Sequence, residues 1–392
     1  MLKINFRTNI IALILTSLFL VYISPSANAE PSTILGTTGD EPNGIIIDSS
    51  GNIYTANGAS NNVSKITPQG VSTTLGTTGA NPFGITIDSS GNIYTANNVD
   101  NTVTKITPGG VSTTLGTTGN NPRGILIDSS GNIYTANYGA NNVSKITPGG
   151  VSTILGTTGT GANPFAITID SSGNIYTAND VDNTVTKITP QGVSTILGTT
   201  GANPFGITID SSGNIYTSNT GADTVSKITP QGVSTTLGTT GAQPVGITID
   251  SSGNIYTANN VDNTVTKITP QGVSTTLGTT GAYPFGITID SSGNIYTSNN
   301  FGATVTKITV FDQAAANAEA ARVAAANAEA ARKAKEQKEL TEILALIPSI
   351  AELTLSLGET TQSLYSTKCV KGKTTKYVKY GAKCPKGYVK KK

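Results

Sequence analysis

The 392-residue sequence contains no histidine, and its only two cysteines are Cys369 and Cys384. Histidine is the commonest general base and metal ligand near neutral pH, so its absence removes the usual means of proton transfer and metal binding. Serine–histidine and cysteine–histidine nucleophile systems are excluded as well. The groups left for chemistry are carboxylates, tyrosines and, between residues 30 and 311, the single arginine Arg123.

Acidic residues are missing from the last 25 positions, where residues 368–392 contain ten lysines. Residues 312–392 hold 8 acids and 15 bases, a net charge of +7, whereas residues 30–311 hold 15 acids and 8 bases, a net charge of −7. A nearly neutral total therefore hides an acidic segment joined to a basic one. We predict that the basic tail binds anionic cell-surface polymer or lipid headgroups. The alternatives are a solvated tail or one that lies against its own chain.

Long apolar runs are also missing. The longest stretch near the N-terminus has fourteen mostly apolar residues, Ile10 to Ile23; it follows Lys3 and Arg7 and precedes Ala27-Asn-Ala29. This order is typical of a secretory signal peptide, here residues 1–29 with cleavage after Ala29. A membrane-spanning helix needs roughly 20 apolar residues, so an uncleaved anchor is the weaker alternative. We expect a secreted or cell-surface protein.

The dominant positive feature is a repeat. The heptapeptide Asp-Ser-Ser-Gly-Asn-Ile-Tyr occurs seven times, every 40 residues except for one step of 42 near Thr160. The copies begin at Asp48, Asp88, Asp128, Asp170, Asp210, Asp250 and Asp290. Each unit holds four short runs rich in Ile, Val, Thr and Tyr between Gly, Pro, Asn and Asp, which predicts four antiparallel strands. Such a period indicates an all-β fold of four-stranded blades.

The two ends of the repeat region favour a closed ring over a linear array. The region opens at Ser32–Gly36 with a fourth strand and closes at Thr304–Thr309 with a third strand that has no successor. A ring uses the leading strand to complete the last blade and leaves no free sheet edge. We therefore predict a seven-bladed β-propeller over residues 30–311, closed by its N-terminal strand.

The pattern P-x-G-I-x-I-D-x-x-G-N-I-Y-x-A-N followed by N-x-V-x-K-I-T-P-x-G resembles the NHL repeat and its relatives, the streptogramin lyases and gluconolactonase-like propellers, over residues 31–310. That superfamily mixes enzymes with binding platforms. The resemblance implies histidine-dependent chemistry for streptogramin lyases, and no position here supplies it. It implies a divalent metal held by acidic and Asn side chains for gluconolactonase-like propellers. The inner strands, Gly-Ile-Thr-Ile-Asp or close variants, contain no unique Glu or Asn, so we expect no metal and no cofactor.

The repeated aspartate of Asp-Ser-Ser-Gly-Asn has two interpretations. A calcium loop needs six to eight oxygen ligands and usually several carboxylates. One carboxylate per turn is explained more simply by hydrogen bonds to the amides of its own turn. We predict the structural role.

Variation among the repeats gathers in the loop after strand two and in the crossover between blades, which share one face of the disc. We call this the variable face and expect any ligand there, because loops on a rigid scaffold commonly bind. Its candidate ligand-binding residues are Arg123, Tyr138, Tyr283, Phe301, Phe83, Phe165, Phe205, Phe285, Asp40, Glu41, Asp100, Asp180, Asp182, Asp223 and Asp262. The alternative is that the four repeated Phe side chains cover the blade junctions as core and that the acids only promote solubility.

The C-terminal segment is predicted to have three parts. Residues 312–347 are an Ala-rich helical spacer capped by Asp312, with Glu329 and Arg332 spaced for contact. Residues 348–366 are a second helix or linker that begins at Pro348, and residues 367–392 are a basic tail stapled by a Cys369–Cys384 disulfide. An apolar stripe of Leu340, Ile343, Ile347, Ile350 and Leu357 either docks on its own chain or supports self-association as a coiled coil.

We predict an exported, non-enzymatic binding module whose variable face takes a protein, peptide, cationic or amphipathic ligand. Nucleic acid is not expected there, because seven acids against one arginine repel phosphate. The first alternative is a metal-dependent lactonase or a streptogramin-lyase-like enzyme, and the second is a self-assembling surface protein.

Overall fold

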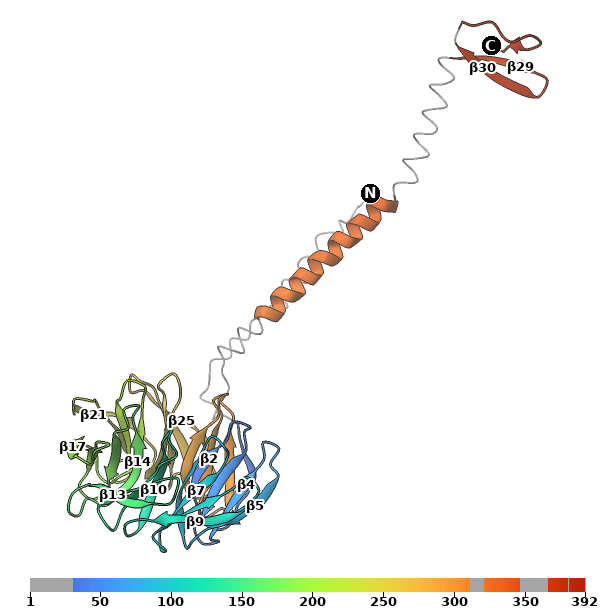
Figure 1. Ribbon diagram of the computed structural model, residues 1–392. Coiled ribbons are helices and arrows are strands. Elements are labelled where there is room, and N and C mark those ends of the chain that lie inside the picture. Colours follow the sequence, from blue (N-terminus) through green and yellow to red (C-terminus); the bar gives the residue numbers. More distant parts are fainter. Residues whose placement is uncertain (1–30, 311–320, 346–365, 380, 392) are drawn as a thin grey trace, which may run out of the picture. The chain divides into compact units, whose positions relative to one another are not determined.

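The computed structural model describes residues 31–310, 321–345, 366–379 and 381–391, and the chain divides into two units, Met1–Val310 and Phe311–Lys392. Within the described part, the first unit consists of seven four-stranded antiparallel sheets arranged like blades (Figure 1). This confirms the predicted all-β class with repeated four-stranded sheets. The predicted signal peptide, the helix start at Asp312 and most of the 348–366 linker lie outside the described residues.

Each sheet has the same four positions. The inner strands are β2 (Pro42–Ile47), β6 (Pro82–Ile87), β10 (Pro122–Ile127), β14 (Pro164–Ile169), β18 (Pro204–Ile209), β22 (Pro244–Ile249) and β26 (Pro284–Ile289). The second strands are β3 (Ile53–Asn57), β7 (Ile93–Asn97), β11 (Ile133–Asn137), β15 (Ile175–Asn179), β19 (Ile215–Asn219), β23 (Ile255–Asn259) and β27 (Ile295–Asn299). The third strands are β4 (Asn62–Ile66), β8 (Thr102–Ile106), β12 (Asn142–Ile146), β16 (Thr184–Ile188), β20 (Thr224–Ile228), β24 (Thr264–Ile268) and β28 (Thr304–Ile308). The outer strands are β1 (Ser32–Thr37), β5 (Ser72–Thr77), β9 (Ser112–Thr117), β13 (Ser152–Thr157), β17 (Ser194–Thr199), β21 (Ser234–Thr239) and β25 (Ser274–Thr279).

The core lies between neighbouring sheets. All five residues of every second strand are buried, as expected for β-branched and aromatic residues on a pleated surface. Tyr54 and Val63 of one sheet form a single buried cluster with Ile93 and Ile106 of the next sheet. The same arrangement recurs around the propeller, so each sheet is held by both of its neighbours.

The first strand of the chain pairs with the last sheet. β1 runs antiparallel to β28, with Ser32 opposite Ile308 and Thr37 opposite Thr304. The inner strand of that last sheet, β26, contacts the inner strands of both neighbouring sheets, β22 and β2. The last sheet therefore also packs against the first. Segments nearly 280 residues apart therefore share one sheet, which makes the N-terminal strand a structural part of the propeller.

The repeated aspartate organises the turn between the first two strands of each blade. One carboxylate oxygen of Asp48 accepts hydrogen bonds from the amides of Ser50 and Asn52, both at 2.9 Å. The other accepts from the Asn52 side chain at 2.8 Å and from the Tyr54 hydroxyl at 3.0 Å. Gly51 supplies the left-handed residue of the turn at φ +80°. The aspartate thus satisfies its own turn, and the described residues contain no group of three or more His, Cys, Asp or Glu suited to a metal.

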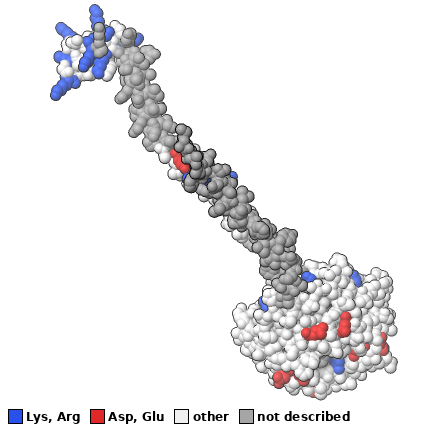
Figure 2. Space-filling model, turned by 180° about the vertical axis from the view of Figure 1, so that it is seen from behind, with Lys and Arg blue, Asp and Glu red and all other residues white. Residues whose placement is uncertain are grey.

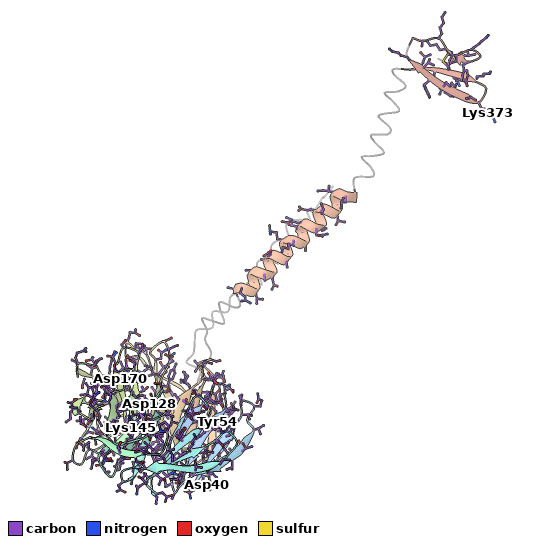
Figure 3. All side chains as sticks on the ribbon, in the orientation of Figure 1. Asp40, Tyr54, Asp128, Lys145, Asp170 and Lys373 are labelled. Atoms are coloured by element: carbon purple, nitrogen blue, oxygen red, sulfur yellow. A yellow bond between two sulfur atoms is a disulfide. The ribbon has the colours of Figure 1, made fainter. Side chains whose placement is uncertain are left out.

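The seven turn aspartates, of which Asp128 and Asp170 are labelled in Figure 3, make folding sensitive to acid. Partial burial disfavours the ionised form of Asp128, but hydrogen bonds from Asn132, Tyr134 and Ser130 outweigh it and hold its pKa below the ordinary value. The pKa values of the other six are lowered in the same way. Such a carboxyl stabilises the fold above its unfolded-state pKa, about 3.9, and this contribution is lost as pH falls through the folded-state pKa.

We therefore expect the melting temperature to stay level from about pH 7 to about pH 5 and to fall steeply below about pH 4. Asp128→Asn should lower the free energy of unfolding by about 1–3 kcal/mol, because it removes acceptors from the turn and from Tyr134. Asp182→Asn, at an exposed position, is the matched control and should change little. A melting temperature that does not change down to about pH 2.5 would contradict this expectation.

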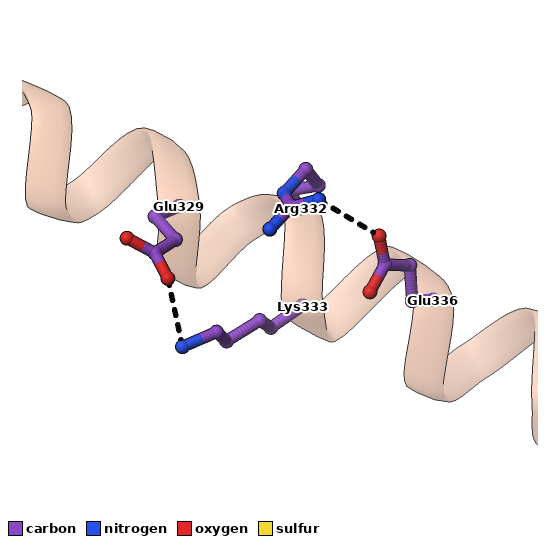
Figure 4. A network of polar contacts seen from close by, with 4 residues as sticks. All are labelled: Glu329, Arg332, Lys333 and Glu336. Carbon is purple, nitrogen blue, oxygen red and sulfur yellow. Dashed lines mark hydrogen bonds and ion pairs between the residues drawn. The ribbon is translucent and has the colours of Figure 1, made fainter.

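The described part of the second unit begins with a helix over residues 321–345. Ion pairs link its successive turns, among them Lys333 to Glu329 at 2.8 Å and Arg332 to Glu336 at 3.3 Å (Figure 4). Sequence spacing predicted a contact between Glu329 and Arg332. In the structure Glu329 pairs with Lys333 instead, and Arg332 pairs with Glu336. Exposed pairs of this spacing stabilise a helix by only about 0.3–0.5 kcal/mol each.

The apolar stripe of this helix is exposed where it is described. Leu340 is 53% and Ile343 is 61% exposed. Ile347, Ile350 and Leu357, together with Pro348, lie outside the described residues, so self-association through the stripe stays a prediction. No helix in the described ranges is long and apolar enough to cross a membrane.

The chain ends in a small three-stranded sheet. β29 (Ser366–Lys371) lies between β30 (Thr374–Lys379) and β31 (Val389–Lys390). Cys369 is fully buried and forms a disulfide with Cys384, with a Cα–Cα distance of 5.6 Å. The predicted disulfide is confirmed, and the basic tail has a folded part.

Candidate functional site: the central cavity of the propeller

The residue after the first proline of each inner strand lies at the centre of the propeller. These residues, with the two that follow each of them, line a cavity of about 260 Å³. The seven are Asn43, Phe83, Arg123, Phe165, Phe205, Val245 and Phe285. Because strands alternate in direction, the start of an inner strand and the loop after strand two share one end of the blade. The cavity lining therefore lies at the end of the inner strands nearest the variable face.

Each of these seven residues is followed by a glycine or an alanine. These small residues let the inner strands approach one another. A Cβ atom on Gly84 would lie 2.4 Å from the backbone oxygen of Arg123, which is far below any allowed contact. On Gly124 it would lie 3.0 Å from the Cα of Ala166. The side chains at the preceding position are thereby held close to a common centre.

Four phenylalanines from four blades meet there. Phe83 contacts Phe165 and Phe285 edge to face, with ring centroids 5.4 and 5.3 Å apart, and Phe165 lies 4.0 Å from Phe205. Phe165 is 5% exposed, whereas the other three are half-buried. They therefore form one aromatic cluster at the centre of the propeller.

Arg123 is held against this cluster. Its guanidinium carbon lies 3.7 Å from the ring centroid of Tyr138, 4.6 Å from that of Phe165 and 5.4 Å from that of Phe83. Its Nε is buried and has no hydrogen-bond partner in the described part of the chain. Burial lowers the pKa of Arg123, while Tyr138 and Asp180 oppose the shift. A cation–π site of this kind holds the guanidinium in place and leaves its Nε as a buried donor without a partner in the described residues.

Tyr138 and Asp180 complete the cluster. The Tyr138 hydroxyl donates to Oδ2 of Asp180 at 3.1 Å, and the Asn203 side chain donates to Oδ1 at 3.1 Å. Asp180 is only 7% exposed. Burial, and then the charge and hydrogen bond of Asp180, raise the pKa of Tyr138. Tyr138 therefore remains a proton donor at neutral pH.

The other predicted acids lie in the surrounding loops. Asp100, Asp223 and Asp262 accept hydrogen bonds from the backbone amides of Ala80, Gln243 and Ala242, at 2.6, 2.8 and 2.7 Å. The carboxylates of these three thus fix neighbouring crossover loops. Asp40, Glu41 and Asp182 are exposed at their loops. Among the seven predicted acids, Asp180 is the one whose described contacts join it to the aromatic cluster, through the Tyr138 hydroxyl.

Tyr283 and Phe301 form a separate exposed pair. Their ring centroids are 4.5 Å apart, and the residues are 43% and 76% exposed. Neither residue lines the central cavity. The structure therefore divides the predicted aromatic residues into a central cluster and one surface pair.

Asn43 lines the cavity but was not among the predicted site residues. Its side-chain oxygen accepts from the Asn300 side chain at 3.0 Å, and its amide donates to the Pro82 oxygen at 3.4 Å. The sequence did hold a signal, since Asn43 replaces Phe at the repeat position that also carries Arg123 and Val245.

Three solved structures resemble the fold. The virginiamycin B lyase of Staphylococcus aureus matches with a TM-score of 0.65 and 21% identity over 72% of this chain and 99% of its own. A catalytically inactive histidine-to-alanine variant of that enzyme, solved with quinupristin, gives 0.64 and 21% over the same shares. A streptogramin B lyase gives 0.64 and 18% over 72% and 98%. These likenesses establish the propeller fold.

A search of curated protein sequences finds no match. The family model for virginiamycin B lyases matches residues 30–218 and 160–336, which together span most of the chain. This confirms the resemblance to streptogramin lyase propellers, and it favours the enzyme-like alternative over the non-enzymatic module predicted from the sequence. The chain belongs to the virginiamycin B lyase family.

Proposed function

We propose that this protein is a streptogramin-lyase-like propeller that binds an amphipathic, peptide-like ligand at the central cavity through Arg123. The main support for this proposal comes from Arg123. Its guanidinium lies against three aromatic rings, yet its buried Nε has no hydrogen-bond partner in the described residues. A buried donor without an acceptor is unfavourable, so an arriving acceptor gains the full value of the bond. Arg123 thus holds an unpaired donor beneath an apolar surface, and a ligand acceptor reaches it when the neighbouring side chains move.

The size of the cavity limits what enters it. A volume of about 260 Å³ lies just below the 300–1,000 Å³ typical of small-molecule pockets. It accommodates one ring-bearing group, with the remainder of the ligand lying over the variable face. Phe83, Phe205 and Phe285 are half-buried and offer the apolar contact.

The charge of the variable face selects the kind of acceptor. Asp40, Glu41 and Asp182 are exposed around it and repel anions. A neutral carbonyl can therefore approach Arg123 more favourably than a carboxylate or phosphate. Quinupristin, bound in the solved complex of the inactive relative, is a suitable first probe.

The absence of histidine separates binding from lyase chemistry. Replacing one histidine in the Staphylococcus aureus relative yields a protein described as catalytically inactive. This chain has no histidine at any position. Ligand binding is therefore the part of the family's function that its residues support best.

Lyase activity is the second candidate, favoured by the family match and by the Tyr138–Asp180 hydrogen bond. A lyase must remove a proton from the substrate and supply one to the departing group. Asp180 would accept the first, and Tyr138, whose pKa is raised, would supply the second. A metal-dependent lactonase fits less well, because the cavity lining contains no carboxylate and the described residues hold no metal-binding cluster.

The test incubates the full protein with quinupristin and measures binding by calorimetry and conversion by liquid chromatography, with the Staphylococcus aureus enzyme as positive control. We expect saturable binding without a new product. Conversion that disappears in both Asp180→Asn and Tyr138→Phe would establish the second candidate. The absence of any binding would contradict the proposal for this ligand class.

A further inference from the structure

We propose that the C-terminal three-stranded sheet is a separate binding module for a linear, phosphate-bearing polymer such as poly(glycerol phosphate). Residues 366–392 contain ten lysines and no acidic residue. Nine of these lysines lie in the described part of the module, and all nine are exposed. Blue side chains gather on this module in Figure 2, whereas the propeller surface in this view shows both red and blue side chains. This inference does not depend on the central cavity.

The lysines of the helix at residues 321–345 have acidic partners, which the lysines of the module lack. Its lysines are also exposed, but each has an acidic partner four residues away: Lys333 with Glu329, Lys335 with Glu339 and Lys338 with Glu342. Its charge is thereby balanced locally. No such internal partner exists in the module, because its sequence has no Asp or Glu. The uncompensated positive charge needs counterions, and a polyanion that releases them binds favourably.

The strand register distributes the lysines over both faces of the sheet. Lys368 lies opposite Tyr377, whereas Lys376 lies opposite Cys369 and therefore on the other face. Lys390 pairs with Cys369 as well and shares that second face. A planar bilayer can contact one face only, but a flexible polymer can follow lysines around the module. The arrangement thus favours a polymer over a membrane surface.

The side-chain types favour simple phosphates over nucleic acid. Residues 366–392 contain no arginine, the side chain most often used to read bases, and lysine binds phosphate as a point charge. Lys368 lies over the ring of Tyr377 at 6.0 Å, and Lys376 lies over that of Tyr388 at 5.5 Å. Each ring therefore has a lysine over it, which reduces the surface open to base stacking.

The test measures binding of the full chain to poly(glycerol phosphate) at several salt concentrations. The variant Lys368→Gln/Lys373→Gln/Lys379→Gln changes three exposed side chains, and Lys333→Gln/Lys335→Gln/Lys338→Gln is the matched control in the helix. We expect the module variant to lose at least about tenfold in affinity. Its salt slope should fall by about 2, since each neutralised phosphate of a single strand contributes roughly 0.7. The control should bind like the unsubstituted protein.

Two further probes decide the source of the phosphate. Phosphatidylglycerol vesicles and single-stranded DNA of matched phosphate content should bind more weakly than the polymer. Tighter binding to the vesicles, or to the DNA, would overturn the assignment to a simple polymer. Equal affinity of the module variant and the control variant would overturn the module as the binding element.

Discussion

Removing residues 30–37 should lower the free energy of unfolding by several kcal/mol and melt the propeller far below the temperature of the full chain. The deletion takes away β1 and leaves β28 as an unpaired edge. Each lost backbone hydrogen bond contributes about 0.5–1.5 kcal/mol, and a domain has only about 5–15 kcal/mol in total. The effect reaches beyond one sheet, because the last sheet also contacts the first through β26 and β2. An unchanged melting temperature would refute the closing role of β1.

Point variants within β1 distinguish the loss of its packing against the first sheet from a nonspecific effect of changing this strand. Leu35 is half-buried against Ile53 and Ile66 of the first sheet, whereas Thr33 in the same strand is exposed. Leu35→Ala should therefore lose about 1–3 kcal/mol, and Thr33→Ala should stay within about 0.5 kcal/mol of the unsubstituted protein. Equal effects of the two would show that β1 is not packed as described.

Arg123→Ala should weaken quinupristin binding by about 10–150-fold. A hydrogen bond to a charged group contributes about 1.5–3 kcal/mol, and 1.4 kcal/mol is a factor of ten in affinity. The substitution also removes the cation held against Tyr138 and Phe165. Stability should fall as well, by about 0.5–2 kcal/mol, because the contacts with the rings are lost. No hydrogen bond of the Nε is lost within the described residues.

Two controls make the Arg123 result specific. Arg123→Lys keeps the charge but loses the planar guanidinium, so it should recover little of the affinity. Arg332→Ala removes an exposed arginine of the helix and should leave binding unchanged. Full binding by Arg123→Ala would show that the ligand does not use the cavity donor.

The strands could be predicted from the sequence because the same residue pattern occurs in every repeat. In the unit that contains Asp88, two of the four short runs rich in Ile, Val, Thr and Tyr are residues 92–96 and 101–107. They form β7 (Ile93–Asn97) and β8 (Thr102–Ile106). Short β-branched runs between fixed turn residues leave few alternatives, and the boundaries shift by one or two residues. The pairing of Cys369 with Cys384 followed from the cysteine count alone.

The site could be predicted only in part. The repeat showed that Phe83, Phe165 and Phe285 occupy equivalent positions, but not that their rings meet, because this depends on how closely the inner strands approach. Nor could the sequence distinguish Asp180, which accepts from Tyr138, from Asp100, which holds a backbone amide. Both lie in the same loop of their blades, and three-dimensional contacts decide their roles.

The most direct test of the account is a crystal structure of the protein with quinupristin. We predict that a ring-bearing group of the ligand lies against Phe83 and Phe285 and that a neutral acceptor lies about 3 Å from Nε of Arg123. A ligand bound over the Asp-Ser-Ser-Gly-Asn turns, or against Tyr283 and Phe301 with the central cavity left empty, would contradict the account.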